Sequence, residues 1–289
     1  MSEDERVGAD GQGRTGPALS FGGVADAYER GRPTYPDDAV TWLLGEQPAI
    51  VLELGAGTGK LTRVVARLGH DVHATDPDEA MLAVLEREVP GIRTAVGGAE
   101  EIPLPDSSVD AVIAGQAFHW FDLDRALPEI ARVLRPGGRV CLLWNLRNEK
   151  IPWVRRLGAL IGSPEEQRDW AQALIFSGLF GFVEDRTFSH WQTIDRDSVQ
   201  DLVLSRSTVA VLDDQARAAK RAEVLAFYDD YGRGMDGMQL PYTTHCFRAD
   251  VLETAKTDRP GADAPEAPSA EGEVPTDGPD DDMLLIDFR

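Results

Sequence analysis

The stretch Ala49-Ile-Val-Leu-Glu-Leu-Gly-Ala-Gly-Thr-Gly-Lys60 decides the fold. It opens with an apolar, β-branched run at residues 50–52, which predicts a buried strand. Three glycines follow at alternate positions, and the residues after Lys60 carry apolar side chains at helical spacing. A strand, a glycine-rich turn and a helix start form one half of a nucleotide-binding βαβ unit. The glycines permit positive φ angles and let a ligand approach the backbone closely.

The spacing of this turn departs from the dinucleotide fingerprint, which is G-x-G-x-x-G. Gly55 and Gly57 fit that pattern, but Lys60 stands at the third position and the third glycine comes one residue early. Glu53, two residues before the turn, suits a cationic ligand better than a pyrophosphate. A Walker A loop is excluded because no Gly-Lys-Ser/Thr follows at the right distance. An ordinary tight turn is the alternative interpretation.

The next strand is predicted at residues 71–76 and ends in a second acid. Asp76 follows Gly55 by 21 residues, which matches the acid that binds a ribose diol about 20 residues after the glycine-rich turn. The alternative role is an N-cap, because Asp76-Pro77 also begins a helix well. That helix should end near residue 88, with Met81 either against a nucleobase or in the core.

A further strand is predicted at residues 109–114, and it delivers the segment Gly115-Gln-Ala-Phe-His-Trp-Phe-Asp122. In open α/β sheets ligands bind outside the carboxyl ends of the strands, so this segment should face the ligand. Gln116 can hydrogen-bond the ligand or orient an acceptor. His119 can act as a general base near neutral pH, and the alternative is a packed histidine bonded to a backbone carbonyl.

Strands and helices alternate five times up to Trp144, which predicts a doubly wound, Rossmann-like α/β fold with helices on both faces of a parallel sheet. The five parallel strands end with one at residues 139–144. Helices are then expected within residues 151–180 and at residues 198–204 and 213–231. Strands at residues 182–194 and 238–248, paired antiparallel, would complete a seven-stranded sheet.

The two ends of the chain differ from this body. Residues 1–18 are poor in apolar side chains and are predicted to be disordered, as is the acidic tail at residues 253–289. One domain is expected over residues 19–252. Its first part, residues 21–36, is either a packing arm or a lid that presents Tyr28, Arg32 and Tyr35 to the ligand.

Composition excludes several classes of protein. The chain has 289 residues and a net charge of −21, which opposes nucleic-acid binding because phosphate contacts need Lys and Arg. Cys141 and Cys246 lie in apolar runs and are expected to be buried free thiols. No window has 18 apolar residues, and the acidic, glycine-rich N-terminus differs from a signal peptide, so a cytoplasmic protein without a membrane partner is expected. No metal site is predicted, and the oligomeric state stays open.

The pattern Glu53-x-Gly55-x-Gly57-x-Gly59 resembles the first motif of the class I S-adenosylmethionine (SAM)-dependent methyltransferases. The run Arg-Val-Leu-Arg-Pro-Gly-Gly at residues 132–138, before a strand, is also typical of them. The arm Phe…Ala…Tyr…Arg-Pro-x-Tyr-Pro and the segment Gln-x-Phe-His-Trp resemble the methyltransferase type 11 group. The resemblance implies core motifs over residues 50–144 and a substrate or cap region over residues 145–252. It also implies SAM as cofactor and a small organic acceptor methylated at a carboxylate, hydroxyl or carbon.

The resemblance further implies a set of site residues. A further strand is predicted at residues 92–96. In the family an acid after this third strand often binds the adenine amine, but Gly98 stands there, so backbone groups near Ala99 and Glu100 are expected to read the base. Arg32 would bind a carboxylate, either of the acceptor or of SAM. The implied cofactor-binding residues are Glu53, Gly55, Ala56, Gly57, Thr58, Gly59, Asp76, Pro77, Met81, Ala99, Glu100, Gln116, Ala117 and Trp120. The implied transfer-site residues are Tyr28, Arg32, Gln116, His119 and Trp120.

Two other functions compete with methyl transfer. A nicotinamide-dependent oxidoreductase can use a similar sheet, although the glycine spacing disfavours it. A SAM-binding protein without catalysis, acting as a partner or sensor through its acidic tail, is the second alternative.

Overall fold

A computed structural model describes residues 25–162, 170–206, 209, 212–231 and 237–257. The predictions of disorder for residues 1–18 and for residues 258–289 lie outside the described residues, as does the start of the arm. The predicted disorder is wrong for the beginning of the tail, where Thr254–Thr257 form the short helix α11. Within the described part, the predicted alternation of strands and helices is present in the predicted order. The strands are β1 (Ile50–Leu54), β2 (Asp71–Asp76), β3 (Arg93–Val96), β4 (Val109–Gly115), β5 (Leu134–Arg147), β6 (Glu184–Ile194) and β7 (Met238–Asp250).

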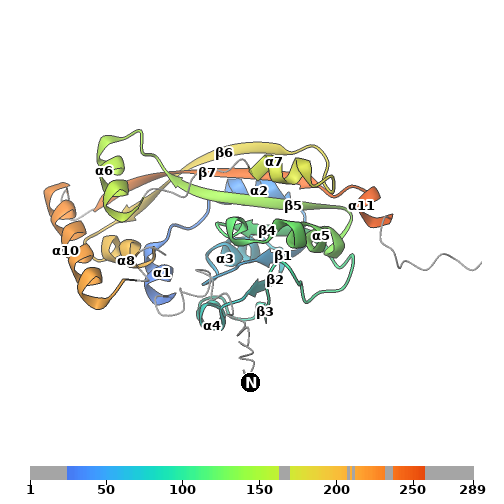
Figure 1. Ribbon diagram of the computed structural model, residues 1–289, viewed down its shortest axis with the longest axis horizontal. Coiled ribbons are helices and arrows are strands. Elements are labelled where there is room, and N and C mark those ends of the chain that lie inside the picture. The colour runs from blue at the N-terminus through green and yellow to red at the C-terminus, as the bar shows by residue number, and fades with distance from the viewer. Residues whose placement is uncertain (1–24, 163–169, 207–208, 210–211, 232–236, 258–289) are drawn as a thin grey trace, which may run out of the picture. The chain divides into compact units, whose positions relative to one another are not determined.

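The seven strands form one sheet in the order β3-β2-β1-β4-β5-β7-β6 (Figure 1). The first five strands pair parallel, and β7 pairs antiparallel with both β5 and β6. The order reverses between β1 and β4, which is the switch point where ligands bind in such sheets. The predicted fold class, with five parallel strands followed by an antiparallel pair, is confirmed.

Helices cover both faces of the sheet. They are α1 (Ala25–Gly31), α2 (Asp37–Leu44), α3 (Lys60–Arg67), α4 (Glu79–Glu88), α5 (Leu123–Val133), α6 (Pro152–Ile161), α7 (Trp170–Phe176), α8 (Ser198–Leu204), α10 (Asp214–Tyr231) and α11 (Thr254–Thr257). Side chains alternate between faces along β1, so Leu52 and Leu54 face α5 while Val51 faces α2 and α3.

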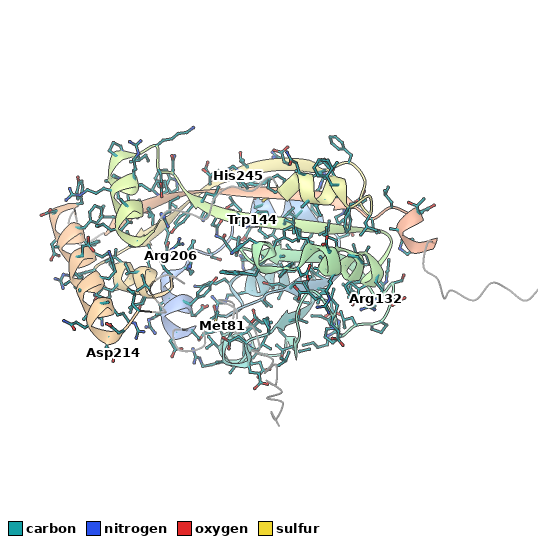
Figure 2. All side chains as sticks on the ribbon, in the orientation of Figure 1. Met81, Arg132, Trp144, Arg206, Asp214 and His245 are labelled. Carbon is teal, nitrogen blue, oxygen red and sulfur yellow. The ribbon has the colours of Figure 1, made fainter. Side chains whose placement is uncertain are left out.

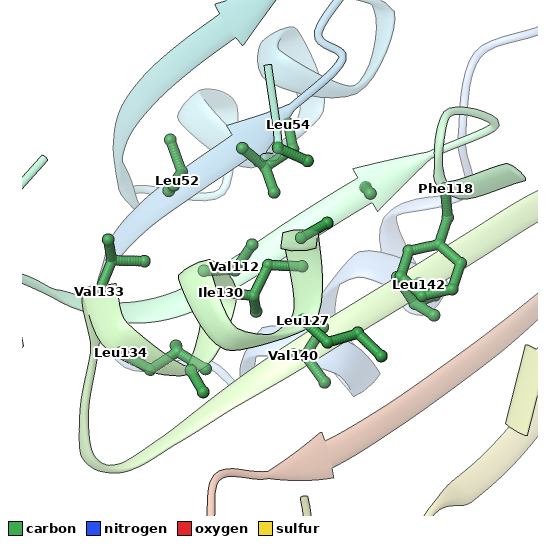
Figure 3. Packing of buried hydrophobic residues seen from close by; sticks show 14 of the residues in the cluster. Leu52, Leu54, Val112, Phe118, Leu127, Ile130, Val133, Leu134, Val140 and Leu142 are labelled. Atoms are coloured by element: carbon green, nitrogen blue, oxygen red, sulfur yellow. The ribbon is translucent and has the colours of Figure 1, made fainter. Parts of the chain in front are cut away.

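The core on the α5 side of the sheet explains the apolar residues of β1, β4 and β5. Leu127 and Ile130 of α5 pack against β1, β4 and β5, and Phe118 fills the end of the same cluster (Figure 3). Phe118, Ile130 and Leu52 are each at most 1% exposed. Burying a side chain of this size stabilises the fold by roughly 1.5–3 kcal/mol. The parallel sheet therefore holds the carboxyl ends of β1, β2 and β4 firmly in place.

A third apolar cluster lies where α6, α8 and α10 meet the start of β7 and the end of β6. Leu157, Val203 and Phe227 come from the three helices, and Leu240 comes from β7. All four are at most 3% exposed. This cluster fixes the helices of the late part of the chain against the antiparallel strands.

The structure differs from the sequence predictions at several boundaries. β5 begins at Leu134, not at residue 139, because Leu134 pairs with Val109 before the register shifts. The Asp110 carboxylate in that shifted region accepts from the Ile50 amide and pairs with Arg135. Residues 135–138 therefore lie within the strand and do not form a separate helix stop.

The two cysteines are free and buried, as predicted. Burial raises the pKa of both thiols to about 12, so they stay protonated. Among the described residues, no helix combines the length and the apolar character needed to cross a bilayer.

Candidate functional site

The glycine-rich turn after β1 has a backbone that only glycine adopts easily. Gly55, Gly57 and Gly59 have φ angles of 69°, 56° and 87°. A Cβ on Gly55 would lie 2.5 Å from the Cβ of Ala117, and one on Gly59 would lie 2.8 Å from Leu85. The turn after β1 thus packs directly on the segment after β4, which leaves backbone N–H groups at the start of α3 for a ligand.

Glu53 is a buried carboxyl group behind this turn. It is 2% exposed, and its Oε2 accepts a hydrogen bond of 2.7 Å from the Thr62 hydroxyl. Burial, and to a smaller extent the charge of Asp76, raise the pKa of Glu53 to about 8. A nearby cation would stabilise the ionised form of Glu53, which burial disfavours.

Asp76 ends β2 beside the same turn and is 8% exposed. Its Oδ2 accepts from the Gly57 amide at 2.8 Å, and its Oδ1 accepts from the Asp78 amide at 2.9 Å. Burial raises the pKa of Asp76 as well. Each oxygen keeps a further lone pair, so the carboxylate can still accept from two ribose hydroxyls.

The N-cap alternative for Asp76 is wrong. The N-cap of α4 is Asp78, whose Oδ1 accepts from the amides of Ala80 and Met81 at 2.9 and 3.4 Å. The helix starts two residues later than the Asp-Pro signal suggested, and Pro77 is exposed in the connection. Asp76 is consequently available for the turn and for a ligand.

The residues predicted to flank a nucleobase lie at the same edge. Met81, on α4 (Figure 2), is 5% exposed, and its Cε lies 3.5 Å from the position of a Cβ on Gly57. Ala99 is buried, and the Glu100 carboxylate accepts from the Asp122 amide at 2.8 Å. Glu100 thereby joins the connection after β3 to the start of α5.

The segment after β4 begins with two predicted residues, Gln116 and Ala117. Gln116 has a φ of 59°, a rare conformation for a residue other than glycine. Its backbone N–H donates to the Leu143 carbonyl, and its side-chain Nε2 donates to the Asn145 carbonyl at 3.0 Å. Ala117 packs on Gly55. The backbone strain at Gln116 occurs at the carboxyl end of β4, where a ligand is expected.

His119 and Trp120 lie further along, in a short 3-10 turn. Their ring centroids are 4.6 Å apart, and Trp120 is 37% exposed. Phe118, between these residues and Ala117, points into the core on the α5 side and anchors the turn. The structure therefore places both predicted residues on a supported turn beside Gln116.

Helix α1 is tied to the glycine-rich turn. Glu29 is 9% exposed, and its Oε2 accepts from the Thr58 hydroxyl at 2.7 Å. Its Oε1 lies 3.3 Å from Lys60 Nζ and 3.0 Å from Arg63 Nη2. Ala25 packs on Met81, so α1 adjoins the predicted ligand edge from two sides.

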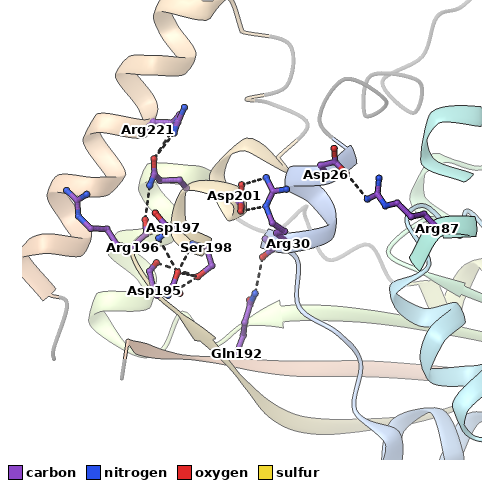
Figure 4. Close-up of polar contacts among 12 residues, drawn as sticks. Asp26, Arg30, Arg87, Gln192, Asp195, Arg196, Asp197, Ser198, Asp201 and Arg221 are labelled. Carbon is purple, nitrogen blue, oxygen red and sulfur yellow. Dashed lines mark hydrogen bonds and ion pairs between the residues drawn. The ribbon is translucent and has the colours of Figure 1, made fainter. Parts of the chain in front are cut away.

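Further contacts of α1 reach three other elements (Figure 4). Arg30 forms a two-bond ion pair with Asp201 of α8, and Asp26 pairs with Arg87 of α4. Gln192 of β6 donates to the Gly31 carbonyl at 3.0 Å. These contacts fix the position of α1 over the sheet.

The predicted arm residues occupy distinct places. Arg32 donates to the Ser205 hydroxyl at 3.0 Å and to the Ser205 carbonyl at 2.8 Å, and its guanidinium lies 5.1 Å from the centre of the Tyr28 ring. Tyr35 is buried, with its hydroxyl beside Gly115. Arg32 thus joins the arm to the end of α8, while Tyr35 reaches the end of β4.

Sequence reasoning missed a polar group on β5, β7 and β6. The Thr244 hydroxyl donates to Asn145 Oδ1 at 2.7 Å and lies 3.3 Å from His190 Nδ1. Since the single Thr244 proton is used, the His190 Nδ1 must carry a proton if it bonds Thr244. The Tyr242 ring stacks on His190 with centroids 5.4 Å apart. Polar residues at alternate positions after Trp144 were the available signal.

Known proteins resemble this chain in sequence and structure. The methyltransferase domain family model matches residues 52–142. An uncharacterised methyltransferase of Mycobacterium tuberculosis is 44% identical over 238 residues, covering 81% of this chain and 96% of the relative. One of Schizosaccharomyces pombe is 41% identical over 188 residues, covering 62% of this chain and 73% of the relative.

A solved structure from Anaeromyxobacter dehalogenans, provisionally described as a type II methyltransferase, has a TM-score of 0.54 and 29% identity. It covers 75% of this chain and 97% of its own. The match to the mycobacterial relative spans nearly the whole of that protein, and the solved structure shares the Rossmann-like architecture. The chain therefore belongs to the class I S-adenosylmethionine-dependent methyltransferases, in the methyltransferase type 11 group.

Proposed function

We propose that this protein binds SAM and transfers its methyl group to a small organic acceptor. The observation that carries the proposal is the pair of buried acids, Glu53 and Asp76, behind a turn that leaves no room for a Cβ at Gly55. An amino-acid ammonium fits Glu53, and a ribose diol fits Asp76. A pyrophosphate would add negative charge beside two carboxyl groups, so a nicotinamide dinucleotide fits this site poorly.

The chain's own residues would hold the cofactor as follows. Glu53 would face the ammonium, the backbone of residues 55–59 would line the methionine and ribose, and Asp76 would accept from the ribose hydroxyls. Ala99 and Glu100 would flank the adenine, with Met81 on its other side. Gln116, Ala117 and Trp120 would complete the wall after β4.

SAM supplies an activated methyl group on a sulfonium that is already a good leaving group. The protein's contribution is therefore mainly positional: it must hold an acceptor atom in line at about 3–3.5 Å from the methyl carbon. Tyr28, Gln116 and His119 lie at the edge where the acceptor would be held, and His119 would take a proton from an acceptor that carries one. A small-molecule acceptor is proposed because the acidic chain does not suit a nucleic acid.

Calorimetric titration of the purified protein with SAM, S-adenosylhomocysteine and NADH tests the proposal. We expect the first two to bind at micromolar concentrations and NADH not to bind. The Asp76→Asn variant should bind SAM at least about tenfold more weakly, which corresponds to about 1.4 kcal/mol. The control is Asp71→Asn, at the opposite end of β2, which should bind normally. NADH binding without SAM binding would contradict the proposal.

A further inference from the structure

Polar side chains gather on one face of the sheet where β5, β7 and β6 run side by side. Asn145 of β5 opposes Thr244 of β7, and Arg147 opposes Tyr242, which in turn opposes His190 of β6. We name these five residues the Arg147 cluster. On either side along β7 the same face is apolar, with Cys246 packed near α2 and Leu240 packed near α6 and α8. A polar group between two apolar clusters needs an explanation, because burial of unpaired polar atoms is unfavourable.

The Arg147 cluster adjoins the predicted transfer site. Asn145 accepts at its carbonyl from the Gln116 side chain, and its Nδ2 donates to the Thr34 carbonyl at 3.0 Å. Gln116 directly precedes Ala117, which packs on Gly55 of the glycine-rich turn. The cluster therefore lies beside the carboxyl ends of β4 and β5, where an acceptor would approach the cofactor.

Arg147 is a buried cation whose hydrogen bonds are incomplete. Its side chain is 4% exposed. Its Nη2 donates to the Gly162 carbonyl at 2.7 Å and lies 3.2 Å from Glu149 Oε1. Its Nε is buried and has no acceptor among the described residues. The Nε therefore retains a donor for a further acceptor, in addition to the carboxylate of Glu149 that already pairs with Nη2.

Other cations lie near Arg147 in a chain whose net charge is −21. Arg147, Arg32 and Arg206 all act on the Tyr242 phenol, and each lowers the pKa of that group, although burial raises it overall. Arg32 is already bonded to Ser205, and the carboxylate that Arg147 contacts belongs to Glu149. Three arginines thus lie near enough to the Tyr242 phenol to lower its pKa, in a chain that is acidic overall.

We infer that the methyl acceptor is a small carboxylic acid whose carboxylate binds Arg147 beside Tyr242. The inference rests on the proposed function and names the class of acceptor for that same site. A carboxylate is favoured because guanidinium donors match its planar pair of oxygens. The Tyr242 hydroxyl can donate to the same group. Neutral His190 adds no charge there, since burial lowers its pKa.

The test is calorimetric titration of the protein saturated with S-adenosylhomocysteine. The probes are straight-chain mono- and dicarboxylic acids of two to ten carbons and benzoic acid, each beside its primary amide. We expect several acids to bind and the matching amides to bind at least about tenfold more weakly, as for loss of a charge-assisted contact. Acids that bind are then assayed as acceptors with labelled methyl. Equal binding of acids and amides, or binding of neither, would overturn the inference.

Variants locate the binding to Arg147. Arg147→Gln should bind the acids at least about tenfold more weakly while its affinity for S-adenosylhomocysteine stays unchanged. Arg93→Gln, at the opposite end of the sheet, is the control and should bind the acids normally. Because Arg147 is buried, Tyr242→Phe, which removes only the hydroxyl, is made as well and should weaken acid binding severalfold. Unchanged acid binding in both cluster variants would overturn the inference.

The titrations separate this inference from the proposed function. If S-adenosylhomocysteine binds and the acids do not, the acceptor class is wrong and the methyltransferase proposal stands. If S-adenosylhomocysteine does not bind, the proposed function itself fails.

Discussion

Folding strongly disturbs the ionisation of Glu53. In the folded protein burial raises its pKa to about 8, from an ordinary value of 4.5. The unfolded chain therefore loses this proton near pH 4.5, while the folded protein keeps it until about pH 8. The stability that Glu53 contributes is complete below pH 4.5 and is lost as the pH rises toward 8.

Replacing Glu53 by Gln should remove this pH dependence. We expect Glu53→Gln to melt close to the wild-type temperature at pH 5 and a few degrees above it at pH 8, because the amide never ionises. Thermal unfolding of the ligand-free protein at both pH values measures the effect. A variant that is less stable than wild type at pH 8 would show that Glu53 is ionised in the folded protein.

If SAM binds with its ammonium beside Glu53, as we propose, binding should be linked to proton release. An ammonium placed beside Glu53 favours the carboxylate, so binding between pH 6 and 7.5 should expel a proton and affinity should rise with pH over this range. Calorimetry in buffers of different ionisation enthalpy counts the protons. We expect the release to disappear in Glu53→Gln. Release of the same size in that variant would assign it to another group.

At the scale of an element, two glycine substitutions test how closely the turn after β1 packs on the segment after β4. Gly55→Ala combines a positive φ with a Cβ 2.5 Å from Ala117, whereas Gly69→Ala has a φ of 93° and nothing within 4 Å. Backbone strain alone costs about 1–2 kcal/mol, and Gly55→Ala should exceed Gly69→Ala by the cost of moving Ala117. Urea unfolding of both variants measures the difference, and only Gly55→Ala should lose SAM binding. Equal losses of stability in the two variants would show that Gly55 and Ala117 are not in close contact.

A second prediction at this scale concerns the contacts that hold helix α1 near the glycine-rich turn. Glu29→Gln removes the charge that holds Lys60 and Arg63 near the turn, so α1 should open more often and SAM should bind severalfold more weakly. Hydrogen exchange of residues 25–35 should be faster in the variant than in wild type. The control is Glu184→Gln on β6, which alters a surface ion pair with Arg248 of β7. Unaltered exchange would show that the contacts of α1 with α8 and α4, and not Glu29, hold the helix in place.

For the whole molecule, the order of elements was predictable because each carries a local signal. Period-two and period-3.6 patterns mark strands and helices within a few residues, and the glycine spacing marks the ligand-binding turn. Gly55 on the turn and Asp76 at the end of β2 were predictable for the same reason. The Arg147 cluster was not, because it is assembled across β5, β6 and β7 by register, and no local pattern pairs Arg147 with Tyr242.

The acidity of the whole chain also has a measurable consequence. With a net charge of −21, the protein should show no binding to double-stranded DNA at 50 mM salt, where phosphate contacts are strongest. Electrophoretic mobility of a labelled duplex at rising protein concentration measures this. A shift that vanishes at 200 mM salt would reveal a basic surface and favour a macromolecular acceptor.

The position of β7 has a consequence for how the chain is made. Of the strands that the structure describes, β7 is the last to leave the ribosome, yet it lies between β5 and β6 in the sheet. Until residues 238–250 have been synthesised, β5 has an open edge and β6 has no strand to pair with. Folding from the N-terminus can thus complete the five parallel strands early, but the late helices must wait. A nascent chain stopped before residue 238 would expose the two edges that β7 covers, one of β5 and one of β6, and chaperones would be expected to hold it at that stage.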